Sequence, residues 1–168
     1  LVVGTEEGVS AVLIYLAIYL LMNIGTFAVI LSMRANGRMV EGVADLAGLS
    51  KNRPLMAAAL ATMMFSMAGI PPFAGFFGKF FIFKAAVDAG LIVLAVIGVL
   101  TSVVAAFYYL RIVKVLYFDE PADQFEPMPP QARWVLGVTS VAVVVFFLFP
   151  LPQVVTAAGN AARALFGA

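Results

Sequence analysis

The sequence predicts an all-α fold, namely a polytopic bundle of transmembrane helices in which one helix is broken. Three observations lead to this prediction. Of the 168 residues, 64% are apolar and only 11% are charged, whereas about a quarter of the residues in an ordinary soluble domain carry charge. Four long apolar stretches, almost free of charge, follow one another along the chain. Two adjacent prolines, Pro71 and Pro72, lie in the middle of the second stretch.

The composition excludes several classes of protein. A mean hydropathy of +1.07 leaves too few polar residues to coat a water-soluble fold of this size. The net charge of +1 gives no electrostatic basis for binding nucleic acid. The sequence has no Cys and no His, which excludes disulfides, thiolate metal sites and iron–sulfur ligation by this chain. We therefore expect no cofactor in this chain.

We expect one membrane domain over residues 1–168, with spans near residues 9–33, 54–88, 90–113 and 134–152. An α-helix needs roughly 20 residues to cross a hydrocarbon core about 30 Å thick, and each range comes close to or exceeds that length. The stretches are too long for the strands of a membrane β-barrel and lack alternating polarity. The chain begins at Leu1, and we expect it to be the C-terminal portion of a longer protein.

The loops predict the orientation of these spans. Most basic residues lie in the loop after the first span or around the loop after the third, which four crossings place on the same side. The positive-inside rule puts residues 34–53 and 114–133 in the cytoplasm and both ends of the chain in the periplasm of a bacterial inner membrane. Residues 119–130, rich in proline and acid, form a solvated connection or a docking surface for a neighbour. The basic residues are Arg34, Arg38, Lys51, Arg53, Arg111, Lys114 and Arg133.

The second span is predicted to be a discontinuous helix. Adjacent prolines remove two backbone donors and clash with the preceding turn, and Gly69 tolerates the dihedral angles of a bend. The first half is expected near residues 55–68 and the second near 73–87, with the break at 69–72. Irregular backbone at membrane depth is found in protein interiors or beside water-filled cavities, and often at ion pathways. A simple proline kink used for packing is the alternative.

Lys79 is the main candidate functional residue. It lies about 13 Å inside the outer end of its span, at 1.5 Å per residue, where a lysine costs about 2.5–3.5 kcal/mol to insert. Phenylalanines surround it in the sequence, and Gly75 and Gly78 allow another backbone to approach. A lysine in such a place can take up and release a proton during transport, and snorkelling to the interface is the alternative.

Lys84 is the weaker candidate. It lies about 140° around the helix from Lys79, so the two lysines do not share a face, and it is close to Asp88. We expect it mainly at the interface, with a relay role as the lesser possibility. Asn23, Thr26, Thr62, Ser66, Thr101 and Ser102 are expected at helix contacts, and Tyr108, Tyr109 and Arg111 as an interface anchor.

Several of these segments resemble one known family. Residues 68–80, AGIPPFAGFFGKF, are similar to the broken-helix signature of the antiporter-like subunits of respiratory complex I, NADH–quinone oxidoreductase. The segments DLAGL at 45–49, Arg53-Pro54, residues 15–27 and YYLR at 108–111 also fit. The whole pattern is most similar to subunit N of that complex.

The resemblance implies more than the residues alone do. The chain would form the last four helices of two inverted repeats, with Lys79 as the distal lysine of a proton path driven by electron transfer from NADH to quinone. Its partners would be the lipid bilayer and the other membrane-arm subunits. FMN, iron–sulfur clusters and quinone would be bound elsewhere in the complex, and the charge partner of Lys79 would lie in the missing first repeat.

Three functions remain open from the sequence. The first is this proton-translocating subunit. The second is a subunit of an Mrp-type cation/proton antiporter or of a membrane-bound hydrogenase, which would share the broken helix. The third is a scaffold in which the break and Lys79 have only structural roles. Unchanged proton pumping after replacement of Lys79 would favour the scaffold.

Overall fold

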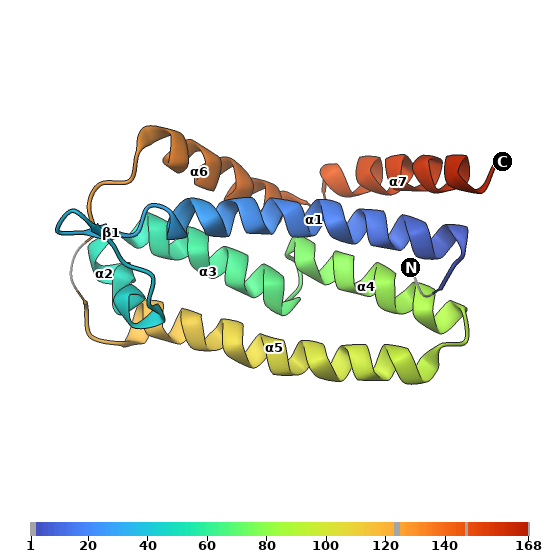
Figure 1. Ribbon diagram of the computed structural model, residues 1–168, viewed down its shortest axis with the longest axis horizontal. Helices are drawn as coiled ribbons and strands as arrows, with labels where there is room; N and C mark the ends of the chain where they lie inside the picture. The colour runs from blue at the N-terminus through green and yellow to red at the C-terminus, as the bar shows by residue number, and fades with distance from the viewer. Residues whose placement is uncertain (1–2, 123–124, 147, 168) are drawn as a thin grey trace.

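The computed structural model describes residues 3–122, 125–146 and 148–167. Its long helices lie side by side in an elongated bundle (Figure 1). Among the described residues, β-structure is limited to one hairpin, formed by β1 (Arg34–Ala35) and β2 (Arg38–Met39). The predicted all-α class is therefore confirmed.

Helix α1 (Glu6–Ile30) is the central helix of the bundle, in contact with α3, α4, α6 and α7. The Thr5 hydroxyl caps its first turn by accepting a hydrogen bond from the Gly8 amide at 3.1 Å. Glu6 and Glu7 also lie in that turn, where their negative charges stabilise the positive end of the helix dipole. Ile14, Ile18 and Val29 are almost fully buried, so the core of the bundle runs along the length of α1.

The two basic loops meet at one end of the bundle, which we call the basic end. The first contains the hairpin, the 3-10 helix η1 (Val43–Leu46) and helix α2 (Leu49–Asn52). The second follows α5, and the two are joined by hydrogen bonds from Ala122 N to Ala47 O, Glu126 N to Arg34 O and Arg53 Nη2 to Phe125 O. The described part of the second loop therefore packs on its own chain.

The opposite end of the bundle, here the far end, carries Glu6, Asp88 and Arg163. Arg163 Nε lies 3.4 Å from Glu6 Oε1, which joins the last helix to the first. The start of α1 and the end of α7 therefore lie at the same end of the bundle, away from the basic loops (Figure 1). This agrees with the predicted arrangement of the loops.

The predicted discontinuous helix is confirmed. Helix α3 (Pro54–Ala68) ends at Gly69, and helix α4 (Ala74–Asp88) begins after Phe73. Pro54 occupies the first turn of α3, where its missing N–H is tolerated. The two helices follow one another from the basic end to the far end, alongside α1 and α5 (Figure 1).

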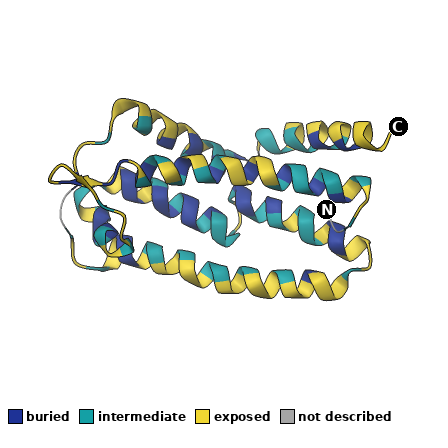
Figure 2. Ribbon diagram, in the orientation of Figure 1, coloured by how far each residue is buried: buried dark blue, intermediate teal, exposed yellow. Residues whose placement is uncertain are grey.

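Helix α5 (Ile92–Phe118) returns the chain to the basic end, and most of its surface is exposed (Figure 2). Val93, Val104 and Phe107 are each 74% exposed, as expected of a helix that faces lipid or other membrane helices. By length and composition, α1 and α5 can each cross a membrane. Helix α5 extends five residues beyond the end of the predicted span 90–113.

The structure differs from the predicted fourth span at residues 134–152. This segment contains the end of α6 (Pro130–Val145) and the beginning of α7 (Pro150–Phe166), whose axes differ by 84°. Phe147, inside the predicted range, lies outside the described residues. Pro150 and Pro152 end the continuous helix because proline cannot donate to the preceding turn. The lack of charged residues correctly indicated an apolar segment. The single span expected over residues 134–152 is bent in the structure.

Candidate functional site

The break between α3 and α4 is closed by local backbone hydrogen bonds. Gly69 has φ +86°, a left-handed conformation that favours glycine. The Gly69 amide donates to Ser66 O at 2.9 Å and the Ile70 amide donates to Phe65 O at 3.1 Å. These two hydrogen bonds together form the Schellman motif, which satisfies two carbonyl groups at the end of α3. It leaves the Ala68 carbonyl free for a partner from another element.

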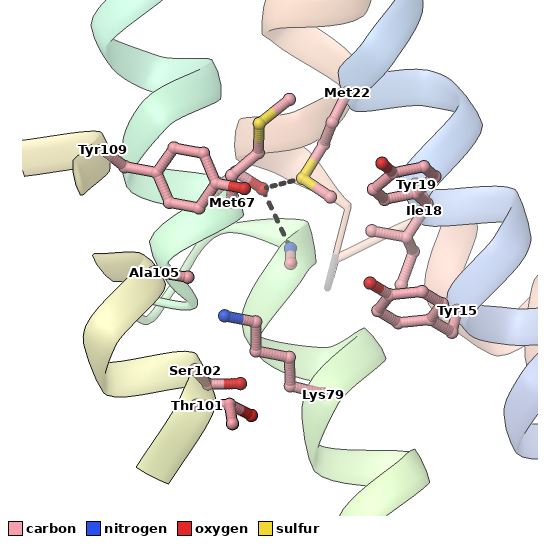
Figure 3. A pocket seen from close by; sticks show the side chains of 12 residues that line it. Tyr15, Ile18, Tyr19, Met22, Met67, Lys79, Thr101, Ser102, Ala105 and Tyr109 are labelled. Atoms are coloured by element: carbon pink, nitrogen blue, oxygen red, sulfur yellow. Dashed lines mark hydrogen bonds between the residues drawn. The ribbon is translucent and has the colours of Figure 1, made fainter. Parts of the chain in front are cut away.

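The two halves of the broken helix are also joined by a buried side chain. The Ser66 hydroxyl, in the last turn of α3, accepts a hydrogen bond from the Gly75 amide in the first turn of α4 at 2.9 Å. The same hydroxyl contacts Met22 Sδ of α1 at 2.9 Å (Figure 3). Ser66 is fully buried, and it caps a helix that follows its own. Ser66 therefore joins α3 both to α4 and to α1.

The close approach at this junction requires glycine at position 75. A Cβ atom there would lie 1.8 Å from the Ser66 carbonyl oxygen and 2.7 Å from its carbon. Both are backbone atoms and cannot rotate away. The sequence interpretation of Gly75 as a site of close backbone approach is correct, although the partner is α3 of the same broken helix.

Lys79 lies on α4 and reaches back to the end of α3. Its Nζ atom donates to the Ala68 carbonyl oxygen at 3.2 Å. The carboxyl end of a helix carries a partial negative charge, so this position favours an ammonium group. Lys79 is half-buried, and among the described residues it forms no ion pair with a carboxylate.

A polar cavity of about 210 Å³ adjoins Lys79. Hydroxyl groups from three helices line it, and the lysine amine points towards α5 (Figure 3). A cavity with several polar groups is suited to hold water, because each water molecule needs two to four partners. The hydroxyl-bearing residues are Tyr15, Tyr19, Ser66, Thr101, Ser102 and Tyr109.

A larger groove of about 580 Å³, also lined by Lys79, runs between α4 and α5. Its lining is mostly apolar, including Phe76, Phe80 and Phe83. Lys84 and Asp88 lie along the groove and form an exposed ion pair. The two candidate lysines therefore line one groove, but only Lys79 also lines the polar cavity.

The structure adds residues that the sequence interpretation assigned to other roles. Tyr109 was expected to anchor the interface, yet it lines the cavity with Lys79. Ser66 was expected at a helix contact, and it proves to be the cap of α4. Spacing along the chain gives no signal for either contact, because each depends on how helices pack. No group of three or more metal-ligating acidic side chains occurs in the described parts of the chain.

The chain is similar to known membrane proteins. The family profile described as "NADH:quinone oxidoreductase/Mrp antiporter, TM" matches residues 1–105. NADH-quinone oxidoreductase subunit N of Methylobacterium nodulans is 59% identical over 99% of this chain and 34% of its own length. The subunit N of Rhodospirillum rubrum is 60% identical over 96% of this chain and 33% of its own length. The chain thus spans about a third of these curated relatives and matches their C-terminal part.

Two solved structures share the fold. One chain of respiratory complex I from Thermus thermophilus with bound aureothin superposes with a TM-score of 0.75 at 32% identity, covering 87% of this chain and 34% of that one. A chain of the Mrp complex from Dietzia superposes with a TM-score of 0.81 at 23% identity, covering 98% of this chain and 39% of that one.

Proposed function

Because this chain belongs to the NADH:quinone oxidoreductase/Mrp antiporter transmembrane family, we propose that it acts in proton translocation with Lys79 as a proton relay. The protein would be the C-terminal part of a membrane-arm subunit of NADH–quinone oxidoreductase. The identity of 59% to a curated subunit N supports this assignment. The chain would serve an enzyme complex without carrying a redox centre itself.

One observation carries the proposal. The Lys79 amine sits against the free carbonyl of the broken helix and borders a cavity lined by hydroxyl groups. The Ala68 carbonyl at the carboxyl end of α3 accepts a hydrogen bond from the Lys79 amine. The amine would exchange a proton with water in the adjoining cavity. Displacing the amine from Ala68 would free it for that exchange.

The remaining parts of the complex would supply the energy and the other groups. Electron transfer from NADH to quinone would take place in other subunits, which would bind FMN, iron–sulfur clusters and the quinone. The carboxylate partner of Lys79 would come from the part of the relatives that this chain does not span. Partners would be other membrane-arm subunits and lipid, with no role for nucleic acid.

The basic end of the bundle would face the cytoplasm of a bacterial inner membrane, and both ends of this chain would face the periplasm. The spans at 9–33, 54–88 and 90–113 would each cross the bilayer, and α6 with α7 would make the fourth crossing. Support comes from the concentration of basic residues at one end of the bundle, including Arg34, Arg38 and Arg53. The Glu6–Arg163 pair supports placing both ends together.

The main alternative is a subunit of an Mrp-type cation/proton antiporter or of a membrane-bound hydrogenase. The description of the family profile that matches residues 1–105 names Mrp antiporters as well, and this observation favours the alternative. Membrane vesicles that contain the assembled protein distinguish these functions. Cation-dependent proton exchange without NADH would support the antiporter, whereas proton uptake that requires NADH and quinone would support the primary proposal.

Replacement of the two lysines in the intact complex tests the relay. We expect Lys79→Met and Lys79→Ala to lower proton pumping and coupled quinone reduction strongly, with normal assembly, because neither side chain can carry a proton. Lys84→Ala should have a smaller effect, since Lys84 is exposed and paired with Asp88. Lys84 would then be at most an auxiliary relay. Pumping is measured as acidification of vesicles during NADH oxidation.

The control is Lys51→Met, which removes an exposed lysine from α2 at the basic end. Normal pumping in Lys79→Met would refute the relay and favour the scaffold function. A larger loss in Lys84→Ala than in Lys79→Met would reverse the assignment of the two lysines.

A further inference from the structure

The surroundings of Lys79 change sharply along α4 towards the far end. Phe83 lies four residues after Lys79, so the two side chains occupy the same face of the helix in successive turns. Val87 continues that face by one more turn. A proton that left Lys79 along this face towards the far end would therefore meet Phe83 first.

Phe83 is held in place by a close contact with α5. A Cβ atom on Gly98 would lie 2.7 Å from Phe83 Cε1, so the ring rests against bare backbone. Phe83 is partly buried, and its ring fills the notch that Gly98 leaves. A ring fixed in this way can close a passage between two helices.

Phe83 lines two mostly apolar spaces near Lys79. One is the groove between α4 and α5, and the other is a separate pocket of about 310 Å³ at the far end, between α1, α4 and α5. Every residue that lines the second pocket is apolar or glycine, including Val12 and Leu94. A pocket lined only by apolar residues stays free of water.

We propose that Phe83 is a dry barrier that separates Lys79 from the far end of the bundle. This inference rests on the proposed function of Lys79. The polar cavity gives Lys79 access to water, whereas Phe83 and the mostly apolar lining of the groove and of the far-end pocket would limit the passage of water towards the far end. Lys84 and Asp88 lie farther along the same groove, where they form an exposed ion pair. The barrier would keep protons from returning through the relay when it is not being driven.

Passive proton flux through the assembled complex tests the barrier. Vesicles containing the intact complex receive an acid pulse without NADH, and the decay of the pH difference is recorded. We expect Phe83→Ser to accelerate the decay several-fold, because a small hydroxyl side chain admits water to Lys79. Phe83→Leu should stay tight because leucine remains apolar. The matched control is Phe107→Ser, which changes an exposed phenylalanine on α5 that lines none of these three spaces.

A second variant separates the barrier from the relay. Adding Lys79→Met to Phe83→Ser should abolish the leak, because the leaking protons would pass through Lys79. A leak that persists in the double variant would overturn the barrier, as would a Phe83→Ser variant as tight as the parent. In either case Lys79→Met alone still reports separately on pumping, so the relay and the barrier can fail independently.

Chemical labelling gives a readout that does not depend on pumping or on a destabilising change. This chain has no native cysteine, so Phe83→Cys and Asp88→Cys can be compared with a membrane-impermeant maleimide in the intact complex. We expect the reagent to label Asp88→Cys and to leave Phe83→Cys largely unmodified, because thiol reaction requires water. Equal labelling of both positions would contradict the barrier.

Discussion

The molecule contains two helix breaks, which differ in their hydrogen bonds and in the side chains that lie beside them. The break between α3 and α4 is fixed by the Ser66–Gly75 hydrogen bond and faces a lysine. The break between α6 and α7 bends the chain by 84°. The backbone hydrogen bonds of its described residues are local, and they include those from Leu148 N to Val145 O and from Leu151 N to Phe146 O.

Prolines alone therefore do not make a site. Prolines lie at both breaks, but within the described residues only the first break has a charged side chain that donates to a carbonyl at the end of a helix. The residues around the second break, from Phe146 to Pro150, are all apolar. The difference lies in what packs against the exposed backbone, and this suggests which substitutions should matter at each break.

The largest effect is expected for Gly75→Ala at the first break. The added Cβ would lie 1.8 Å from the Ser66 carbonyl oxygen, and helix backbone cannot move without opening the junction. We expect destabilisation beyond the roughly 1–3 kcal/mol usual for an overpacked site. The measurements are the amount of assembled complex and its thermal unfolding midpoint.

The matched control for this change is Gly137→Ala in α6. A Cβ atom there meets nothing within 4 Å, and alanine favours the helix over glycine. The stability should stay the same or rise slightly. If Gly75→Ala behaved like Gly137→Ala, the tight junction between α3 and α4 would be wrong.

An intermediate effect is expected for Ser66→Ala. The change leaves the Gly75 amide without its partner in a buried position, and losing a helix cap costs about 0.5–2 kcal/mol. The unfolding midpoint of the complex should fall, and pumping should fall further if the position of Lys79 depends on the junction.

Ser140→Ala serves as the comparison for Ser66→Ala. The Ser140 hydroxyl donates only to Leu136 O of its own helix at 2.7 Å, so its loss leaves no buried backbone amide without a partner. A drop of equal size in the two variants would show that the cap across the break contributes nothing special.

The smallest effect is expected for Arg163→Ala in α7, the helix that follows the second break. Arg163 pairs with Glu6 and so ties α7 to α1, but the two side chains are 57% and 42% exposed. An exposed ion pair contributes about 0–1 kcal/mol, and salt screens it. A double-mutant cycle with Glu6→Gln should give a coupling energy in this range that shrinks at high salt. A larger coupling, insensitive to salt, would show that α7 is held as firmly as the first break.

The sequence predicts the first break, and it does not predict the second. Pro71, Pro72 and Gly69 give strong local signals, and the observed helix ends at Ala68 and Ala74 agree closely with the predicted ones. Residues 134–152 were predicted from their lack of charge, a criterion that ignores Pro150 and Pro152. The sequence also singles out the lysine near the break, because inserting an ammonium group into the hydrocarbon of a membrane costs free energy.

The sequence by itself determined that the chain is an all-α membrane bundle with a broken helix and a lysine beside it. These properties follow from composition, from spacing and from the local chemistry of proline and glycine. Only the tertiary structure decided that Lys79 binds the Ala68 carbonyl, that Ser66 caps α4, and that Tyr109 lines one space beside the lysine and Phe83 another. Such contacts depend on the rotation and offset of packed helices, which hydrophobic patterns leave open when helices are apolar on every side.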